Sequence, residues 1–104
     1  MIDMDWVWED LTAWHTDPFM GEGRHQHTWR VTAFFAADPP RDARSMKASL
    51  RLILDAWEGR DLPPELWSGR ALARAVWQCH GNADCIGVKV ERVEGFGAGV
   101  GAYR

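Results

Sequence analysis

Three histidines, His15, His25 and His27, have the side chains and the spacing that a metal site requires. His25 and His27 stand two apart at the start of a segment that alternates like a β-strand, and residues two apart in a strand point to the same face. A third imidazole from a neighbouring strand would fill the third position of a tetrahedral zinc site, and the fourth would stay open for water or substrate. The alternative is that these are ordinary histidines that only form hydrogen bonds, which their spacing does not exclude.

The two cysteines, Cys79 and Cys85, are the other side chains that bind metals readily. Their spacing matches no common zinc pattern, and a disulfide between them would be unusual in the cytosol. Cys79 also falls in the apolar stripe of an expected helix. We therefore interpret both as buried structural thiols.

The size and charge of the chain limit the classes of function. Its 104 residues fit one domain, residues 1–104, and its apolar content of 46% is that of a globular protein. The net charge of −3 provides no basic surface for nucleic acid, and no apolar run is long enough to cross a membrane. Acidic residues interrupt the N-terminal segment, which disfavours a signal peptide. We expect a cytoplasmic protein that acts on a small molecule and gains stability as a homo-oligomer.

Two alternating segments, residues 2–15 and 25–37, predict a pair of strands. Between them, residues 16–24 contain Pro18 and two glycines and predict a loop. Each histidine shares a strand face with mainly apolar residues. The first face carries Val7, Glu9, Leu11, Ala13 and His15, and the second carries His25, His27, Trp29, Val31, Ala33 and Phe35.

Helical periodicity follows in two segments. Asp42 is placed to cap a helix that runs to about Trp57, and Ser68 is placed to cap a second helix that runs to about His80. Glycines after each helix are expected to end it. The inward stripes at helical spacing are Met46, Leu50, Ile53, Leu54 and Trp57, and then Leu72, Val76 and Cys79.

Two further strands are predicted at residues 86–91 and 96–103, with a turn near Gly95. The alternate glycines of the last strand do not form a phosphate loop, because no helix follows them; a bulge or a crowded subunit contact explains them better. The order strand-strand-helix-helix-strand-strand predicts an α+β fold, a four-stranded antiparallel sheet with two helices on one face. Association into a β-barrel would cover the other face and the sheet edges.

Six short motifs follow one another between about Val7 and Tyr103. Two of them contain the histidines: Leu11-Thr12-Ala13-Trp14-His15, and Gly23-Arg24-His25-Gln26-His27-Thr28-Trp29-Arg30-Val31. The others lie at residues 42–47, 53–55 with 60–62, 68–77 and 96–98. In type and order they resemble motifs of the 6-pyruvoyl-tetrahydropterin synthase and 6-carboxytetrahydropterin synthase family, whose first two read aromatic-Ser-Ala-Ala-His and Leu-His-Gly-His-Asn/Thr-Tyr-Arg-Val.

The resemblance implies the tunnelling fold, a ββααββ unit whose sheets join into a trimeric barrel. In that family, trimers often pair into hexamers, and active sites lie between subunits. The resemblance also implies that His15, His25 and His27 are zinc ligands. Imidazole binds iron, nickel and copper as well, so the residues themselves leave the metal open.

The chain departs from the family wherever the family moves protons or holds the pterin. Gly21 stands at the position of the catalytic cysteine, Glu58-Gly59 at that of the Asp-His pair, and Arg92 at that of the pterin-anchoring glutamate. An arginine there would repel the N–H donors of the pterin edge and would prefer a carboxylate or phosphate. The alternative for Arg92 is a solvated strand charge.

We therefore expect a zinc-dependent enzyme of altered chemistry, a lyase, cyclase or isomerase acting on a small, anionic, non-pterin metabolite in biosynthesis. Glu22 and Glu58 are the candidate general acid or base, with Asp17 in the same loop as Glu22. Each of these carboxylates would more commonly be a plain surface charge. Arg92 and Trp14 are the candidate substrate-binding residues.

Two other classes of protein remain open on the sequence. A non-catalytic binding or assembly protein of the same fold, with a structural metal, would explain why three catalytic roles are lost together. A cupin-like metal protein would also carry His-x-His on a strand, although two helices argue against an all-β barrel. The seven tryptophans are interpreted mainly as core and subunit-interface residues, and Trp14 or Trp29 as the wall of a pocket.

Overall fold

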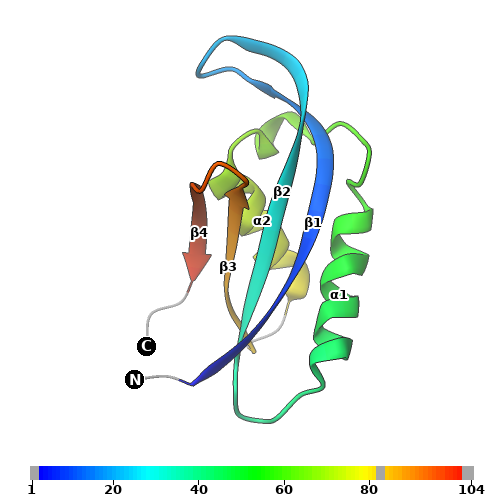
Figure 1. Ribbon diagram of the computed structural model, residues 1–104, viewed down its shortest axis with the longest axis vertical. Coiled ribbons are helices and arrows are strands. Elements are labelled where there is room, and N and C mark those ends of the chain that lie inside the picture. Colours follow the sequence, from blue (N-terminus) through cyan, green and yellow to red (C-terminus); the bar gives the residue numbers. More distant parts are fainter. Residues whose placement is uncertain (1–2, 82–83, 102–104) are drawn as a thin grey trace.

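A single antiparallel sheet forms from the two ends of the chain, and two helices from its middle cover one face (Figure 1). The computed structural model describes residues 3–81 and 84–101. The elements are β1 (Met4–Asp17), β2 (Glu22–Ala36), α1 (Ala43–Asp55), a 3-10 helix (Pro64–Leu66), α2 (Gly69–His80), β3 (Cys85–Arg92) and β4 (Gly97–Gly101). The strands lie in the order β1-β2-β3-β4; α1 packs against β1, and α2 against β3 and β4. The α+β class and the element order are confirmed, and the helices exclude an all-β barrel.

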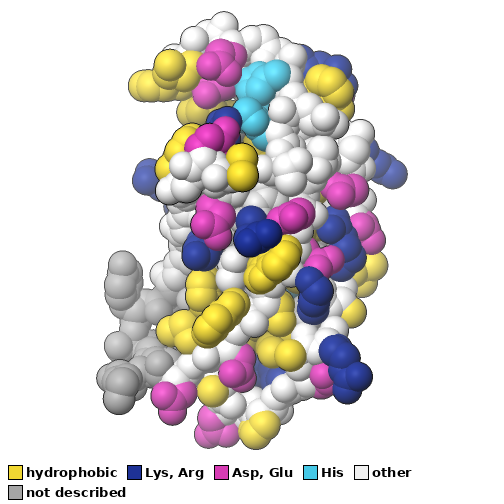
Figure 2. Space-filling model, in the orientation of Figure 1, with side chains coloured by type: hydrophobic (Ala, Val, Ile, Leu, Met, Phe, Trp, Pro, Cys, Tyr) yellow, Lys and Arg dark blue, Asp and Glu magenta, His cyan; other side chains and the backbone are white. Residues whose placement is uncertain are grey.

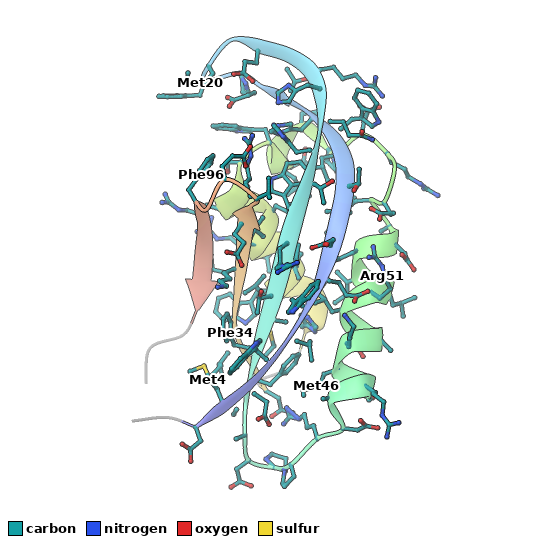
Figure 3. All side chains as sticks on the ribbon, viewed as in Figure 1. Met4, Met20, Phe34, Met46, Arg51 and Phe96 are labelled. Atoms are coloured by element: carbon teal, nitrogen blue, oxygen red, sulfur yellow. The ribbon has the colours of Figure 1, made fainter. Side chains whose placement is uncertain are left out.

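The hairpin of β1 and β2 is longer than the sequence predicts. The loop expected over residues 16–24 shrinks to a turn at residues 18–21, because both strands continue into it. Asp17 closes this turn: its carboxylate accepts hydrogen bonds from the N–H groups of Phe19 and Met20, at 3.0 and 3.1 Å. The loop prediction was wrong because turn residues mark a change of direction and do not show how far the flanking strands pair. Met20 stands at the tip of the projecting hairpin (Figure 3).

The core lies between the sheet and the helices, and the predicted faces form it. Its buried residues include Val7, Leu11, Ala13, Trp29, Val31, Ala33, Phe35, Met46, Leu50, Leu54, Leu72, Val76, Val88 and Val90. The helix caps are also confirmed: Asp42 accepts from the Arg44 N–H at 2.9 Å, and Ser68 from the Ala71 N–H at 3.1 Å. α1 ends at Asp55 instead of Trp57. None of the described helices is long and apolar enough to cross a membrane.

Alanine substitutions at Leu50 and Leu52 test which face of α1 packs into the core. Leu50 is fully buried, whereas Leu52 on the same helix is 75% exposed. We expect Leu50→Ala to lower the free energy of unfolding by about 3 kcal/mol, because it leaves a cavity, and Leu52→Ala to change it by less than about 0.5 kcal/mol. Urea unfolding of both variants measures this difference, and equal losses would contradict the orientation of α1.

The prediction that both cysteines are buried was wrong for Cys79, which is exposed. The buried stripe of α2 runs through Leu72, Ala73 and Val76, and Cys79 lies on its flank in the last turn of the helix. Cys85 is buried at the start of β3, and this burial raises the pKa of its thiol, as expected for a structural cysteine.

The segment after α1 folds back along the outer edge of β1. Its backbone hydrogen bonds run from Gly59 N–H to the Thr12 carbonyl (2.7 Å), from Trp14 N–H to the Arg60 carbonyl (2.8 Å) and from Leu62 N–H to the Trp14 carbonyl (2.8 Å). Residues 59–62 therefore lie beside the C-terminal end of β1 and pair with its outer edge. The 3-10 helix that follows then brings Trp67 to His15.

No helix of the described residues covers the other face of the sheet (Figures 1 and 2). This face carries Trp6, which is 62% exposed, and Trp8, which is 41% exposed. The Arg30 guanidinium carbon lies 3.7 Å from the centroid of the Trp8 ring. Hydrophobic side chains gather over the lower half of this face in Figure 2. Among the tryptophans, Trp29 is therefore buried in the core, whereas Trp6 and Trp8 lie on this open face.

Candidate metal centre

The three histidines lie together at the end of the molecule where the β1–β2 hairpin projects (Figure 2). His15 of β1 is paired with His25 of β2, and His27 follows on the same face. The ring centroids are 4.5 Å apart for His15–His25, 4.6 Å for His25–His27 and 5.0 Å for His15–His27. One nitrogen from each ring lies within 4.8 Å of the others, so the cluster could hold a metal ion.

Backbone carbonyls orient two of these rings. His15 Nδ1 lies 2.8 Å from the Trp67 carbonyl oxygen, and His25 Nδ1 lies 2.7 Å from the Gly23 carbonyl oxygen. Because a carbonyl can only accept, each Nδ1 carries the proton and donates it, which leaves the lone pair of each neutral ring on Nε2. Partners of this kind orient the histidines of metal sites and set their tautomers.

In the neutral forms of His15 and His25, two acceptor nitrogens and the Glu22 carboxylate then face one another. The Nε2 atoms of His15 and His25 are 3.0 Å apart, and a Glu22 carboxylate oxygen lies 3.5 Å from His25 Nε2. Such acceptors repel one another unless a proton or a metal cation lies between them. Two imidazole ligands of one tetrahedral zinc ion would have their nitrogens about 3.3 Å apart. The pair of His15 and His25 therefore fits a divalent cation with only a small adjustment, whereas the ligand nitrogen of His27, within 4.8 Å of the others, would have to move closer to them.

His27 completes the cluster in a form suited to binding a metal. Burial lowers its pKa, and the charges of Arg92 and the other two histidines lower it further, against an opposing effect of Glu94. Its ring makes no hydrogen bond within the described part of the chain. The neutral imidazole that this environment favours is the form that metals bind.

A cavity of about 260 Å³ opens beside His15. Aromatic residues form part of its wall: Trp29, Trp67 and Phe96. Trp29 also meets the rings of His15 and His27 edge-on, at centroid distances of 5.2 and 5.5 Å. A concave site with apolar walls and a few polar groups is typical of small-molecule binding.

Three charged candidates from the sequence lie at this site. Asp17 and Arg92 line the cavity, and Glu22 lies beside His25. Arg92 reaches the site from the end of β3, where it pairs with Trp29 across the sheet. The hairpin and the β3–β4 turn thus bring together residues that are far apart in the chain.

Glu58 is placed elsewhere, at the outer edge of β1. One of its carboxylate oxygens accepts a hydrogen bond from the Thr12 N–H at 2.7 Å, and the other lies 3.8 Å from the Arg51 guanidinium. The carboxylate therefore satisfies an exposed backbone N–H of a strand edge. The structure does not bring it to the histidines.

Trp14 and Trp29 both adjoin histidines in the sequence, but only Trp29 packs against the cluster. Trp14 alternates to the opposite face of β1 from His15, and its ring centroid lies 4.1 Å from the Arg24 guanidinium carbon. Sequence reasoning missed Trp67, whose carbonyl orients His15. No local signal marks Trp67, because it reaches the site only through the path of the chain after α1.

No model of a protein family matches this sequence, and no curated protein matches it. Membership of the 6-pyruvoyl-tetrahydropterin synthase family therefore stays a prediction from the motifs. The function has to be argued from the site itself.

Proposed function

We propose that this protein is a metal-dependent enzyme in which His15, His25 and His27 bind one zinc ion and leave a coordination position open to the adjoining cavity. The convergence of two Nε2 lone pairs, each fixed by a carbonyl-bound Nδ1–H, is the observation that supports this most directly. Zinc, when bound, would polarise a carbonyl or hydroxyl oxygen of a substrate. The proposed reaction is a lyase, cyclase or isomerase step on a small non-pterin metabolite.

Glu22 is the residue best placed to move a proton in this reaction. Its carboxylate lies 3.5 Å from His25 Nε2 and is 56% exposed, so it can exchange protons with solvent while facing the site. Asp17, which lines the cavity, is the second candidate. The rings of Trp29 and Trp67 exclude water from part of the cavity wall.

The proposal includes assembly of the subunits into a barrel through their sheet edges, as in the tunnelling fold. Within the described residues, the outer edge of β4 has no strand beside it. Along the outer edge of β1, by contrast, the Lys47 and Arg51 side chains donate to the carbonyls of Trp8 and Asp10. The segment after α1 covers the end of this strand. The uncovered edge of β4, together with the exposed Trp6 and Trp8, favours association. They equally favour the second candidate function, a non-catalytic assembly protein of this fold with a closed structural metal.

Metal titration separates the two candidates. Metal-free protein is titrated with Zn²⁺ and, in parallel, with Co²⁺, whose visible spectrum reports the coordination geometry. We expect saturation at about one ion per chain and a tetrahedral Co²⁺ spectrum that shifts when azide enters the open position. Light scattering on the same sample gives the number of subunits. A spectrum that azide does not change would favour the structural metal, and failure to bind either ion would remove the proposed enzyme.

A further inference from the structure

We propose that the cavity beside His15 binds a small hydroxy or oxo carboxylic acid, with Arg92 holding the carboxylate while a second oxygen of the same molecule reaches the metal. This inference rests on the proposed metal site and names the class of compound that the site accepts. Four observations support it: the position of Arg92, its unused donors, the charge around the site and the size of the cavity.

Arg92 and His15 line the same cavity. Arg92 lies opposite Trp29, on the sheet face that carries the cluster, and its side chain is 29% exposed. A molecule bound in this cavity is therefore within reach of the guanidinium.

The Arg92 guanidinium is held in place but only partly used. Nη2 donates to a Glu94 carboxylate oxygen at 3.0 Å, and the guanidinium carbon lies 5.2 Å from the centroid of the Phe96 ring. Within the described residues, Nε and Nη1 make no hydrogen bond. A fixed guanidinium with free N–H donors is matched to a carboxylate in geometry as well as in charge.

The charges around the site favour a singly charged ligand. Asp17 lines the cavity, Glu22 lies near His25, and Glu94 pairs with Arg92. These three carboxylates balance the charges of a divalent cation and of Arg92. A dianion such as phosphate would therefore meet more repulsion than a monocarboxylate would.

The cavity also limits the size of the ligand. Its volume of about 260 Å³ suits a small metabolite, although His27 and Arg92 also line a second cavity of about 680 Å³. The aromatic side chains of the cavity wall would pack against a short apolar carbon chain of the ligand. A hydroxyl or oxo group on that skeleton supplies the second oxygen, which a simple fatty acid lacks.

Calorimetric titration of the zinc-loaded protein tests this inference. The probes are pyruvate, 3-hydroxybutyrate and inorganic phosphate. We expect at least one of the two acids to bind about tenfold or more tightly than phosphate, and Arg92→Met to weaken that binding by about 10- to 100-fold, the range for hydrogen bonds to a charged group. Arg92→Lys keeps the charge but loses the planar fork, and is expected to fall between Arg92→Met and the wild type.

Arg44→Met is the matched control, because it removes the same charge from a side chain that is 94% exposed on α1. The zinc content of every sample is measured first, so that loss of metal and loss of the acid are separated. Equal affinity for the acid in Arg92→Met and Arg44→Met, at full zinc content, overturns the inference and leaves the metal site standing. Tighter binding of phosphate than of either acid also overturns it. A wild-type protein that binds no zinc removes the proposed function and this inference together.

Discussion

His27→Ala is expected to weaken zinc binding by about 100-fold or more, since loss of an outer partner alone costs a metal site about 10- to 100-fold and here a ligand itself is lost. The fold is expected to survive the change. His27 makes no hydrogen bond within the described residues, so the substitution removes the imidazole and its ring contacts with Trp29, His15 and His25. Competition with a chromophoric zinc chelator measures the affinity of the variant and of the wild type.

His80 supplies the matched control for this experiment. It is the one histidine of the chain outside the cluster, and its half-buried ring packs edge-on against Phe35 with a centroid distance of 5.4 Å. His80→Ala should lose some stability and keep its zinc affinity. Zinc at 100 times its dissociation constant should stabilise the wild type and His80→Ala by about 2.7 kcal/mol, and His27→Ala far less. Equal stabilisation of all three proteins would falsify the site.

Gly97→Ala is expected to lower the free energy of unfolding by about 4 kcal/mol, a loss large enough to point to a specific structural cause. A Cβ atom at this position would lie 2.0 Å from the Val90 carbonyl oxygen and 2.7 Å from Glu91 Cα. Both obstacles belong to the backbone of β3, so no side-chain rotation relieves them and β4 has to move. Crowding within the sheet is therefore a sufficient reason for glycine here.

Alanine substitutions at two other glycines are expected to cost less stability than Gly97→Ala. A Cβ at Gly23 would meet nothing within 4 Å, and one at Gly99 would lie 3.1 Å from the Val88 carbonyl oxygen. We expect Gly23→Ala to stay within about 1 kcal/mol of the wild type, because alanine also restricts the unfolded chain, and Gly99→Ala to fall between the other two. Urea unfolding gives the order, and a Gly97→Ala protein as stable as Gly23→Ala would mean that β4 does not approach β3 as closely as described.

Local chemistry explains why so much of the fold could be predicted. A period of two along β1 and β2 and a helical period along α1 and α2 follow from backbone geometry, and each shows in a short window of sequence. The caps at Asp42 and Ser68 and the left-handed Gly81 act on their own helix ends and are equally visible.

The failures lie where distant segments meet. Pro18 and Gly21 mark the turn, but only the pairing of β1 with β2 shows that the strands extend to Asp17 and Glu22. Cys79 is a second case: it is exposed, because the buried residues of α2 are Leu72, Ala73 and Val76, and the helical spacing alone did not show this.

For the candidate site, residue types and alternation were enough to place His25 and His27 on one face, because that relation is a property of any β-strand. The tertiary structure decided the other features of the site. It pairs His15 with His25, places the Trp67 carbonyl in hydrogen-bond contact with His15 and brings Arg92 to the cavity. It also places Trp14 and Glu58 on other surfaces, away from the histidines. These contacts depend on strand register and on the path of the chain after α1. Both are set by the packing of the whole core, which no short stretch of sequence records.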